Sequence, residues 1–247
     1  MRMKMFDPRF YPEVAFGGFP RMDGVIQYYS RINSLIAPDS IVVDFGCGRG
    51  QHADDPIPFR RALRNLRGKV AKVIGLDVDI AAKDNPTIDE FKLLAPGSKW
   101  PLENDSVDLA ICDYVLEHLP DPDIFFLEAR RTLRVGGILC LATTNLFSYV
   151  GLATKLIPNR FHSRIVTSVL EGRKAQDVFP TLHRCNTIRA VRREMLKNGF
   201  ETAIYGFDGG PGYLTFSKIA YSLGYLHQQI APSFIRPIIV AFGRKLS

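Results

Sequence analysis

The stretch IVVDFGCGRGQH, residues 41–52, constrains the fold of this 247-residue chain more than any other segment. A short apolar run reaches Asp44 and then enters a turn that holds Gly46, Gly48 and Gly50. Glycines let the backbone turn sharply and let a ligand approach without Cβ atoms in the way. In an open α/β sheet, ligands bind where strands end in such turns. We expect a helix to begin directly after the turn and to offer its free N–H groups to a ligand.

Further runs of strand character alternate with helical segments along the first 145 residues. This alternation is typical of βαβ units, and it predicts a parallel sheet covered by helices on both faces. The expected strands are 41–45, 72–78, 90–94, 107–113 and 138–144. The expected helices are 25–36, 58–69 and 123–137, of which the last stops at Gly136 and Gly137.

The alternation stops beyond residue 145. We expect one domain in which an irregular arm precedes a cofactor-binding core, followed by a helical cap insertion and the last part of the sheet. These parts cover residues 1–24, 25–145, 146–185 and 186–247, respectively. The last part is expected to contain a helix over 186–200 between Asn186 as N-cap and Gly199 as stop, an apolar helix over 213–230, and strands over 201–207 and 237–245.

The glycine spacing separates two kinds of nucleotide cofactor. A dinucleotide site needs G-x-G-x-x-G and an acidic residue about 20 positions later. Here Gln51 replaces the third glycine, and Asp77 in GLDVD follows Asp44 by 33 positions. Asp44 would repel a pyrophosphate but tolerate an ammonium group. A carboxylate at Asp77 can accept both hydroxyl protons of a ribose.

Four segments in order resemble the class I S-adenosylmethionine-dependent methyltransferases of the methyltransferase type 11 kind. They are VVDFGCGRG, GLDVD, WPLENDSVDLAICDYVLEHLPDP (100–122) and LRVGGILCLATTN (133–145). The resemblance implies a Rossmann-like, doubly wound α/β sheet of seven strands, mostly parallel with one antiparallel strand, and S-adenosyl-L-methionine as cofactor without a metal ion. The cofactor-binding positions that it implies are Asp44, Gly46, Cys47, Gly48, Gly50, Asp77, Val78, Leu94, Asp113 and Tyr114.

The region after the third expected strand departs from the family pattern. Many members have an acidic residue there that meets the adenine amino group, whereas this chain has Leu94 and Ala95. We therefore expect adenine recognition to rest on backbone groups and apolar packing, with Leu94 as a contact.

Histidines are the candidates for a catalytic base, because a hydroxyl acceptor must lose its proton near neutral pH. His118 follows the fourth expected strand, and His183 lies in the polar segment TLHRCNT after the cap. Each has an alternative structural role: His118 would cap a loop together with Glu117, and His183 would belong to a helix-capping turn. Neither His162 nor His227 has a sequence neighbourhood that singles it out.

The positive charge of the chain is concentrated in its last two-fifths. Of a net charge of +7, residues 151–247 carry 14 Lys/Arg against 5 Asp/Glu, and no acidic residue follows Asp208. A basic part favours an anionic acceptor, a membrane surface or nucleic acid, or else forms a solvated face. No RNA-binding module is recognisable, so nucleic acid is the less favoured partner. The cap residues expected to shape an acceptor pocket are Tyr149, Lys155, Arg160, His162 and Arg164.

These observations predict an S-adenosylmethionine-dependent methyltransferase that acts on an oxygen of a small-molecule or glycan- or lipid-linked acceptor. The competing hypotheses are a nicotinamide-dependent oxidoreductase, an RNA-binding or RNA-modifying protein, and a cofactor-binding protein without catalysis. The sequence has no recognisable signal peptide and no apolar run of about 18 residues, which predicts a cytoplasmic protein or one peripheral to a membrane. The acceptor and the oligomeric state are left open.

Overall fold

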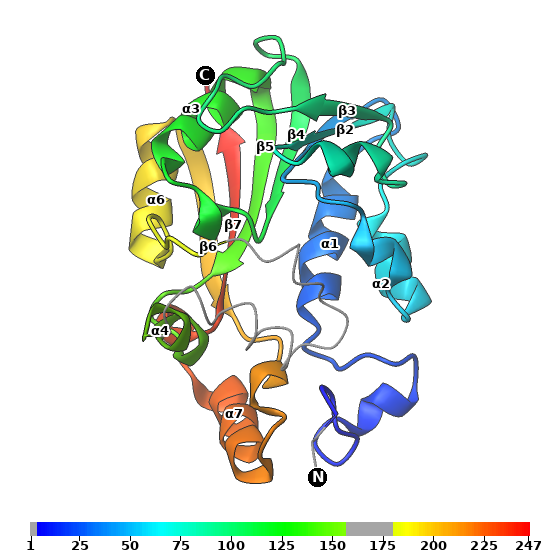
Figure 1. Ribbon diagram of the computed structural model, residues 1–247, viewed down its shortest axis with the longest axis vertical. Coiled ribbons are helices and arrows are strands. Elements are labelled where there is room, and N and C mark those ends of the chain that lie inside the picture. Colours follow the sequence, from blue (N-terminus) through cyan, green and yellow to red (C-terminus); the bar gives the residue numbers. More distant parts are fainter. Residues whose placement is uncertain (1–3, 157–179) are drawn as a thin grey trace.

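The computed structural model describes residues 4–156 and 180–247. A seven-stranded sheet in the order β3-β2-β1-β4-β5-β7-β6 forms its centre (Figure 1). Strand β7 runs antiparallel to its neighbours β5 and β6, and the other neighbouring strands pair in parallel. This arrangement confirms the predicted Rossmann-like sheet. The strands are β1 (Ile41–Phe45), β2 (Lys72–Asp77), β3 (Glu90–Leu93), β4 (Val107–Asp113), β5 (Leu133–Thr144), β6 (Phe200–Phe207) and β7 (Ile238–Lys245).

Helices cover both faces of this sheet. Figure 1 shows α1 and α2 on one side and α3 and α6 on the other, while α4 and α7 lie beyond the end of β5. The helices are α1 (Gly24–Leu35), α2 (Pro58–Arg64), α3 (Pro122–Thr132), α4 (Tyr149–Leu156), α6 (Ile188–Lys197) and α7 (Lys218–Ile230). Short 3₁₀ turns are η1 (Pro12–Ala15), η2 (Gln51–Asp54), η3 (Ile80–Asp84), η4 (Leu116–His118), η6 (Gly212–Leu214) and η7 (Ser233–Ile235).

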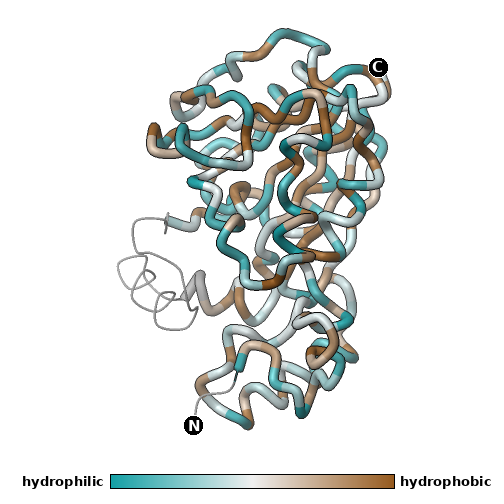
Figure 2. The backbone as a smooth tube through the Cα atoms, turned by 90° about the vertical axis from the view of Figure 1, so that its right-hand side faces the viewer, coloured by the Kyte–Doolittle hydropathy of each residue, from teal (hydrophilic) through white to brown (hydrophobic). Residues whose placement is uncertain are grey.

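The hydrophobic core has two layers because successive strand residues point to opposite faces of the sheet. Val43 of β1 belongs to the layer shared with α3 and α6, whereas Val42 belongs to the layer shared with α1. Figure 2 shows apolar segments running through the upper part of the molecule, where the sheet lies, and recurring at the lower end. Burial on both faces explains why the central strands read as nearly continuous apolar runs.

Strand register brings the ends of β1, β2 and β4 to one edge of the sheet. Phe45 at the end of β1 pairs with Leu76 of β2 and with Cys112 of β4. The residues that follow these three positions, Gly46, Asp77 and Asp113, therefore leave the sheet side by side. This carboxyl edge is where the candidate site is built.

Two helices end earlier than the sequence pattern predicts. Helix α3 stops at Thr132 and not at the Gly136–Gly137 pair, because Leu133 is already extended and pairs with Val107 of β4. Strand pairing therefore overrides helix propensity over 133–137. Helix α2 stops at Arg64, since the next residue takes an extended conformation.

The prediction that a helix begins directly after the glycine turn is wrong. Residues Gln51–Asp54 form the 3₁₀ turn η2, and α2 begins only at Pro58. The apolar helix expected from residue 213 begins at Lys218, where Ser217 is the N-cap.

The cap of α6 also differs from the prediction. The N-cap is Thr187, which accepts from the Ala190 N–H, and not Asn186, which is buried. The predicted stop at Gly199 is confirmed by its left-handed φ of 72°. Of the cap insertion, the structure describes α4; the positions called Arg160, His162 and Arg164 lie outside the described residues.

A buried amide ties the end of β5 to the chain that leads into β7. Asn145 is fully buried, and its Nδ2 donates to the carbonyl oxygens of Phe234 and Arg236, both at 2.8 Å. The Asn145→Ala variant leaves these carbonyls unsatisfied, so we expect it to lower the free energy of unfolding by about 2–3 kcal/mol in urea denaturation. The exposed Asn104→Ala control should change it by less than about 0.5 kcal/mol. Equal effects of the two substitutions would contradict this role.

Candidate functional site

The three glycines of the turn have different structural roles. All three adopt left-handed φ values, between 54° and 72°. A Cβ on Gly46 would lie 2.3 Å from Val115, and a Cβ on Gly50 would lie 2.3 Å from the Asn85 Oδ1. A Cβ on Gly48 meets nothing within 4 Å. The outer glycines therefore serve packing, while the middle one leaves open space at the carboxyl edge.

The carboxylate of Asp77 fixes this turn to the end of β2. Its Oδ2 accepts the Gly48 N–H at 2.8 Å, and its Oδ1 accepts the Asp79 N–H at 2.8 Å. Asn85 adds a second clamp, because its Nδ2 donates to the Cys47 carbonyl oxygen at 2.9 Å. Each Asp77 oxygen keeps a second lone pair that can accept a hydroxyl, as the predicted ribose contact requires.

Three carboxylates lie close together beside the turn, those of Asp44, Asp77 and Asp113, and we call them the anionic cluster. The pKa of Asp44 is raised to about 7, mainly by burial and also by the nearby charges of Asp113 and Asp77, while Arg64 acts in the opposite direction. Asp113 accepts from the Tyr29 hydroxyl at 2.9 Å and from Arg64 at 3.1 Å. A cationic ligand would relieve the repulsion among these carboxylates, whereas a pyrophosphate would increase it.

The other predicted cofactor contacts divide into exposed and buried side chains. Val78 and Tyr114 are exposed at the carboxyl edge, and Tyr114 adopts a left-handed φ of 58° directly after β4. The Cys47 side chain is buried against β2. Leu94 points into the core, and the exposed side chain at that end of β3 is Leu93. An adenine contact near Leu94 stays a prediction, and the side chain that could reach solvent-side ligands there is Leu93.

His118 lies above a buried polar network centred on Glu117. The Glu117 carboxylate accepts from Thr143 at 2.7 Å and from Thr144 at 3.1 Å. Its carbonyl oxygen accepts the N–H groups of Leu182 and His183. The network therefore holds residues 180–183 against the end of β5. This arrangement agrees with the loop-capping role considered for Glu117.

Both predicted histidines are held by this segment. His118 Nδ1 lies 2.9 Å from the Pro180 carbonyl oxygen, which can only accept, so Nδ1 carries the hydrogen and Nε2 is the basic atom. His183 adopts a left-handed φ of 52°, and its N–H donates to the Glu117 carbonyl at 3.1 Å. A catalytic role for either residue stays a prediction.

A second histidine site, which the sequence did not indicate, lies at the end of β6. Asp208 is fully buried; its Oδ1 accepts the Gly210 N–H, and its Oδ2 lies 2.9 Å from His227 Nδ1. The carboxylate fixes the hydrogen on Nδ1 and leaves Nε2 basic. The Tyr149 ring packs edge-on against the partly exposed imidazole at 5.3 Å. The 19 positions between the two residues follow no local spacing rule, which is why the pair was missed.

Helix α1 contacts both the segment of the Asp208–His227 pair and the anionic cluster. Gly209 lies against Gly24 at the start of α1, with its Cβ position 3.6 Å from the Gly24 nitrogen. Tyr29, further along the same helix, donates to Asp113. Both the pair and the anionic cluster therefore contact helix α1 at the carboxyl edge of the sheet.

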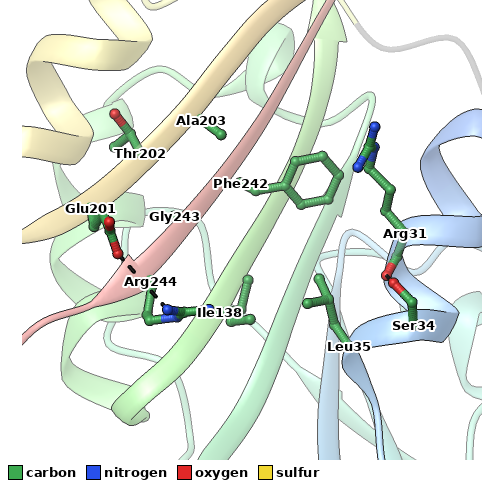
Figure 3. Close-up of a pocket in the computed structure, with 10 residues that line it drawn as sticks. All are labelled: Arg31, Ser34, Leu35, Ile138, Glu201, Thr202, Ala203, Phe242, Gly243 and Arg244. Carbon is green, nitrogen blue, oxygen red and sulfur yellow. Dashed lines mark hydrogen bonds and ion pairs between the residues drawn. The ribbon is translucent and has the colours of Figure 1, made fainter.

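A hollow between α1 and β7 is not part of this site. Figure 3 shows it lined by Arg31 and Leu35 of α1, Phe242 and Arg244 of β7, and Glu201 of β6. Arg244 and Glu201 lie at the end of β7 and the start of β6, so the hollow is at the opposite, amino edge of the parallel strands.

Comparison with known sequences places the glycine turn inside a recognised domain. Residues 43–141 match the family model described as "Methyltransferase domain". A probable S-adenosylmethionine-dependent methyltransferase of Mycolicibacterium smegmatis is 33% identical over 58% of this chain and 55% of its own length. The ubiquinone biosynthesis O-methyltransferase of Cupriavidus pinatubonensis is 30% identical over 42% of this chain and 41% of its own. The chain thus spans about half the length, or less, of these curated relatives.

A solved structure agrees with the fold. The geranyl diphosphate C-methyltransferase of Streptomyces coelicolor, solved with S-adenosyl-L-homocysteine, superposes with a TM-score of 0.52. The superposition covers 89% of this chain and 77% of the other at 16% identity. At that identity the likeness establishes the shared fold alone.

The open space at Gly48 yields a prediction with a matched control. Gly48 and Gly68 both have left-handed φ values, and a Cβ on either meets nothing within 4 Å. We expect Gly48→Ala and Gly68→Ala to lose similar folding stability, about 1–2 kcal/mol, in urea denaturation. Only Gly48→Ala should weaken S-adenosylhomocysteine binding, by about tenfold or more in calorimetry. Equal affinity of the two variants would mean that the ligand does not approach this turn.

The raised pKa of Asp44 makes cofactor binding depend on pH. A ligand with an ammonium group favours the ionised carboxylate, so below pH 7 binding must expel a proton. Affinity for S-adenosylhomocysteine should therefore rise with pH by up to about tenfold per unit below the pKa and level off above it. We expect Asp44→Asn to abolish this rise in calorimetry between about pH 6 and pH 8.

The exposed Asp84→Asn variant is the control for that experiment and should keep the pH dependence. Affinity that falls as the pH rises in the native protein would contradict the assignment of Asp44 as a partner of a cation.

Proposed function

We propose that this chain, whose residues 43–141 match the family of methyltransferase domains, uses S-adenosylmethionine to transfer a methyl group to a hydroxyl oxygen of a small-molecule or glycan- or lipid-linked acceptor. The single observation that carries the proposal is the group of three carboxylates, the anionic cluster, beside the open turn at the carboxyl edge. There the open turn at Gly48 and the carboxylates of Asp44 and Asp77 offer complementary contacts to a ligand that has a ribose and positive charge.

The anionic cluster and the open turn at Gly48 fit S-adenosylmethionine better than a nicotinamide dinucleotide. The cofactor, when bound, supplies an electrophilic methyl group on a sulfonium, so the protein has to fix geometry and not to activate the donor. Asp77 would hold the ribose hydroxyls, and Asp44 would favour the amino end. The same carboxylates would disfavour a pyrophosphate, which argues against the oxidoreductase alternative.

The Asp208–His227 pair supports oxygen as the methylated atom. The cofactor, when bound, would supply the methyl group, and His227 Nε2 would accept the proton that the acceptor hydroxyl loses. Asp208 holds the hydrogen on Nδ1 and would stabilise the imidazolium that results. The name of the Cupriavidus relative also specifies O-methylation.

The acceptor class is proposed from charge and apolar exposure. The basic last two-fifths of the chain would favour an acceptor with a phosphate or carboxylate. Exposed apolar side chains on α7, next to His227, would suit an acceptor with a lipid portion. Together these features favour a glycan- or lipid-linked hydroxyl over an uncharged, fully polar acceptor.

The experiment that tests this function uses S-adenosylmethionine with a labelled methyl group and a cell extract separated into lipid, glycan, RNA and small-molecule pools. We expect label in the lipid or glycan pool, in a product whose methyl group is part of an ether. Label in RNA, or a methyl group on carbon or nitrogen, would contradict the proposal.

The assignment of His227 gives a direct prediction for catalysis. His227→Asn should lower kcat by about 10²–10⁴, the usual contribution of a general base, while S-adenosylhomocysteine affinity stays unchanged. Asp208→Asn should lower kcat as well, because the imidazole then loses the carboxylate that orients it.

His118→Asn, at the base that the sequence predicted, is the matched comparison; because His227 is the base in the proposal made here, this variant should retain most of the activity. A large loss in His118→Asn together with full activity in His227→Asn would move the base to His118 and overturn the assignment made here.

A further inference from the structure

Helix α7 presents one apolar face to solvent. Ile219, Leu223, Leu226 and Ile230 are 76%, 63%, 52% and 71% exposed, respectively. Their spacing of four, three and four positions places them along one side of the helix. The opposite side carries Tyr221, Gly224 and Gln228, which are buried against the rest of the molecule. The helix therefore uses its less apolar side for packing and leaves its most apolar side uncovered.

Two exposed aromatic side chains flank α7 in the chain. Phe216 before α7 is 65% exposed, and Phe234 in η7 after it is 61% exposed. We call these six residues the α7 patch: Phe216, Ile219, Leu223, Leu226, Ile230 and Phe234. Contiguous exposed apolar surface of this kind marks an interaction site far more often than scattered single residues do.

The charges around the α7 patch select an anionic occupant. No acidic residue follows Asp208 in the sequence, and Asp208 is itself fully buried and bonded to His227. Lys218 lies exposed at the start of α7, and Arg236 follows the 3₁₀ turn that holds Phe234. An apolar helix face whose own segment, residues 209–247, carries cations and no carboxylates is typical of helices that lie in the headgroup region of anionic membranes.

The position of α7 allows such contact without disturbing the sheet. Figure 1 shows the helix at one end of the long axis of the molecule, away from the layers that cover the sheet. None of the helices in the described part of the chain is long and apolar enough to cross a bilayer. Contact with a membrane through α7 would therefore be interfacial.

We propose that the α7 patch docks the protein on the surface of an anionic lipid bilayer. The four aliphatic side chains and the two phenylalanines enter the boundary between headgroups and acyl chains, while nearby cations meet the lipid phosphates. His227 follows Leu226 directly, so docking places the Asp208–His227 pair near the headgroup layer. The proposal goes beyond the methyltransferase function and does not depend on it, because docking requires neither cofactor nor acceptor.

The test is binding of the full chain, without cofactor, to vesicles of phosphatidylcholine and phosphatidylglycerol in a three-to-one ratio. We expect the native protein to co-sediment with these vesicles and to bind pure phosphatidylcholine vesicles more weakly. The double variant Ile219→Gln, Leu223→Gln should bind at least about tenfold more weakly, because it loses two of the aliphatic side chains that would enter the bilayer. The matched control is Leu127→Gln, Leu196→Gln, whose two leucines are each 56% exposed on α3 and α6. It should bind like the native protein.

A fluorescence measurement separates insertion from loose attraction. The native chain has a single tryptophan, Trp100, which is buried, so a Leu223→Trp variant adds an exposed reporter on the patch. Its emission should shift to the blue on adding the anionic vesicles. No binding by the native protein, or equal binding by the two double variants, would overturn the proposal. If the native protein is a dimer in solution and the Ile219→Gln, Leu223→Gln variant is a monomer, the proposal is also overturned, because a second copy then covers the patch.

Discussion

The hydrogen bond from the Gly48 N–H to Asp77 is the contact on which the site depends. It joins the turn after β1 to the end of β2, and it is possible only because strand register places Phe45 opposite Leu76. The bond points a carboxylate and an open stretch of backbone toward the same space, since a Cβ at Gly48 would meet nothing there. A shift of one residue between these strands would send Asp77 to the other face of the sheet and dissolve the site.

Electrostatics then determines which ligand this space accepts. Asp44, Asp77 and Asp113 converge at one edge, and the raised pKa of Asp44 reflects its burial and the mutual repulsion of the carboxylates. Positive charge on a ligand relieves that repulsion, so the anionic cluster suits a methyl donor with a sulfonium group. The proposed base, His227, comes from a different layer, formed by α7 and α4 beyond the strand ends. Donor binding and acceptor activation are thus assigned to separate parts of the chain, and the proposed membrane contact lies on the part that carries the base.

The sequence predicted the sheet well, and with it the place of Asp44, Asp77 and Asp113 at the carboxyl edge, because both rest on local patterns. Strand runs that end on Asp44, Asp77 and Asp113 fix their own positions at the carboxyl edge, whatever the rest of the chain does. Helix ends were less predictable, since pairing of Leu133 with β4 and the 3₁₀ turn after Gly50 are decided by tertiary contacts. The Asp208–His227 pair could not be predicted, because a buried carboxylate and a histidine 19 positions apart meet only through the packing of α7 against the end of β6. Arg64 and Tyr29 likewise reach Asp113 from helices whose surface patterns give no sign of it.

Isothermal titration calorimetry with S-adenosylhomocysteine and, separately, with NADH tests the central claim most directly, because both ligands carry an adenosine but only NADH carries a pyrophosphate. The account predicts a one-to-one complex with S-adenosylhomocysteine at micromolar concentrations and no heat of binding with NADH. Binding of NADH, or no binding of S-adenosylhomocysteine at high micromolar concentrations, would contradict it.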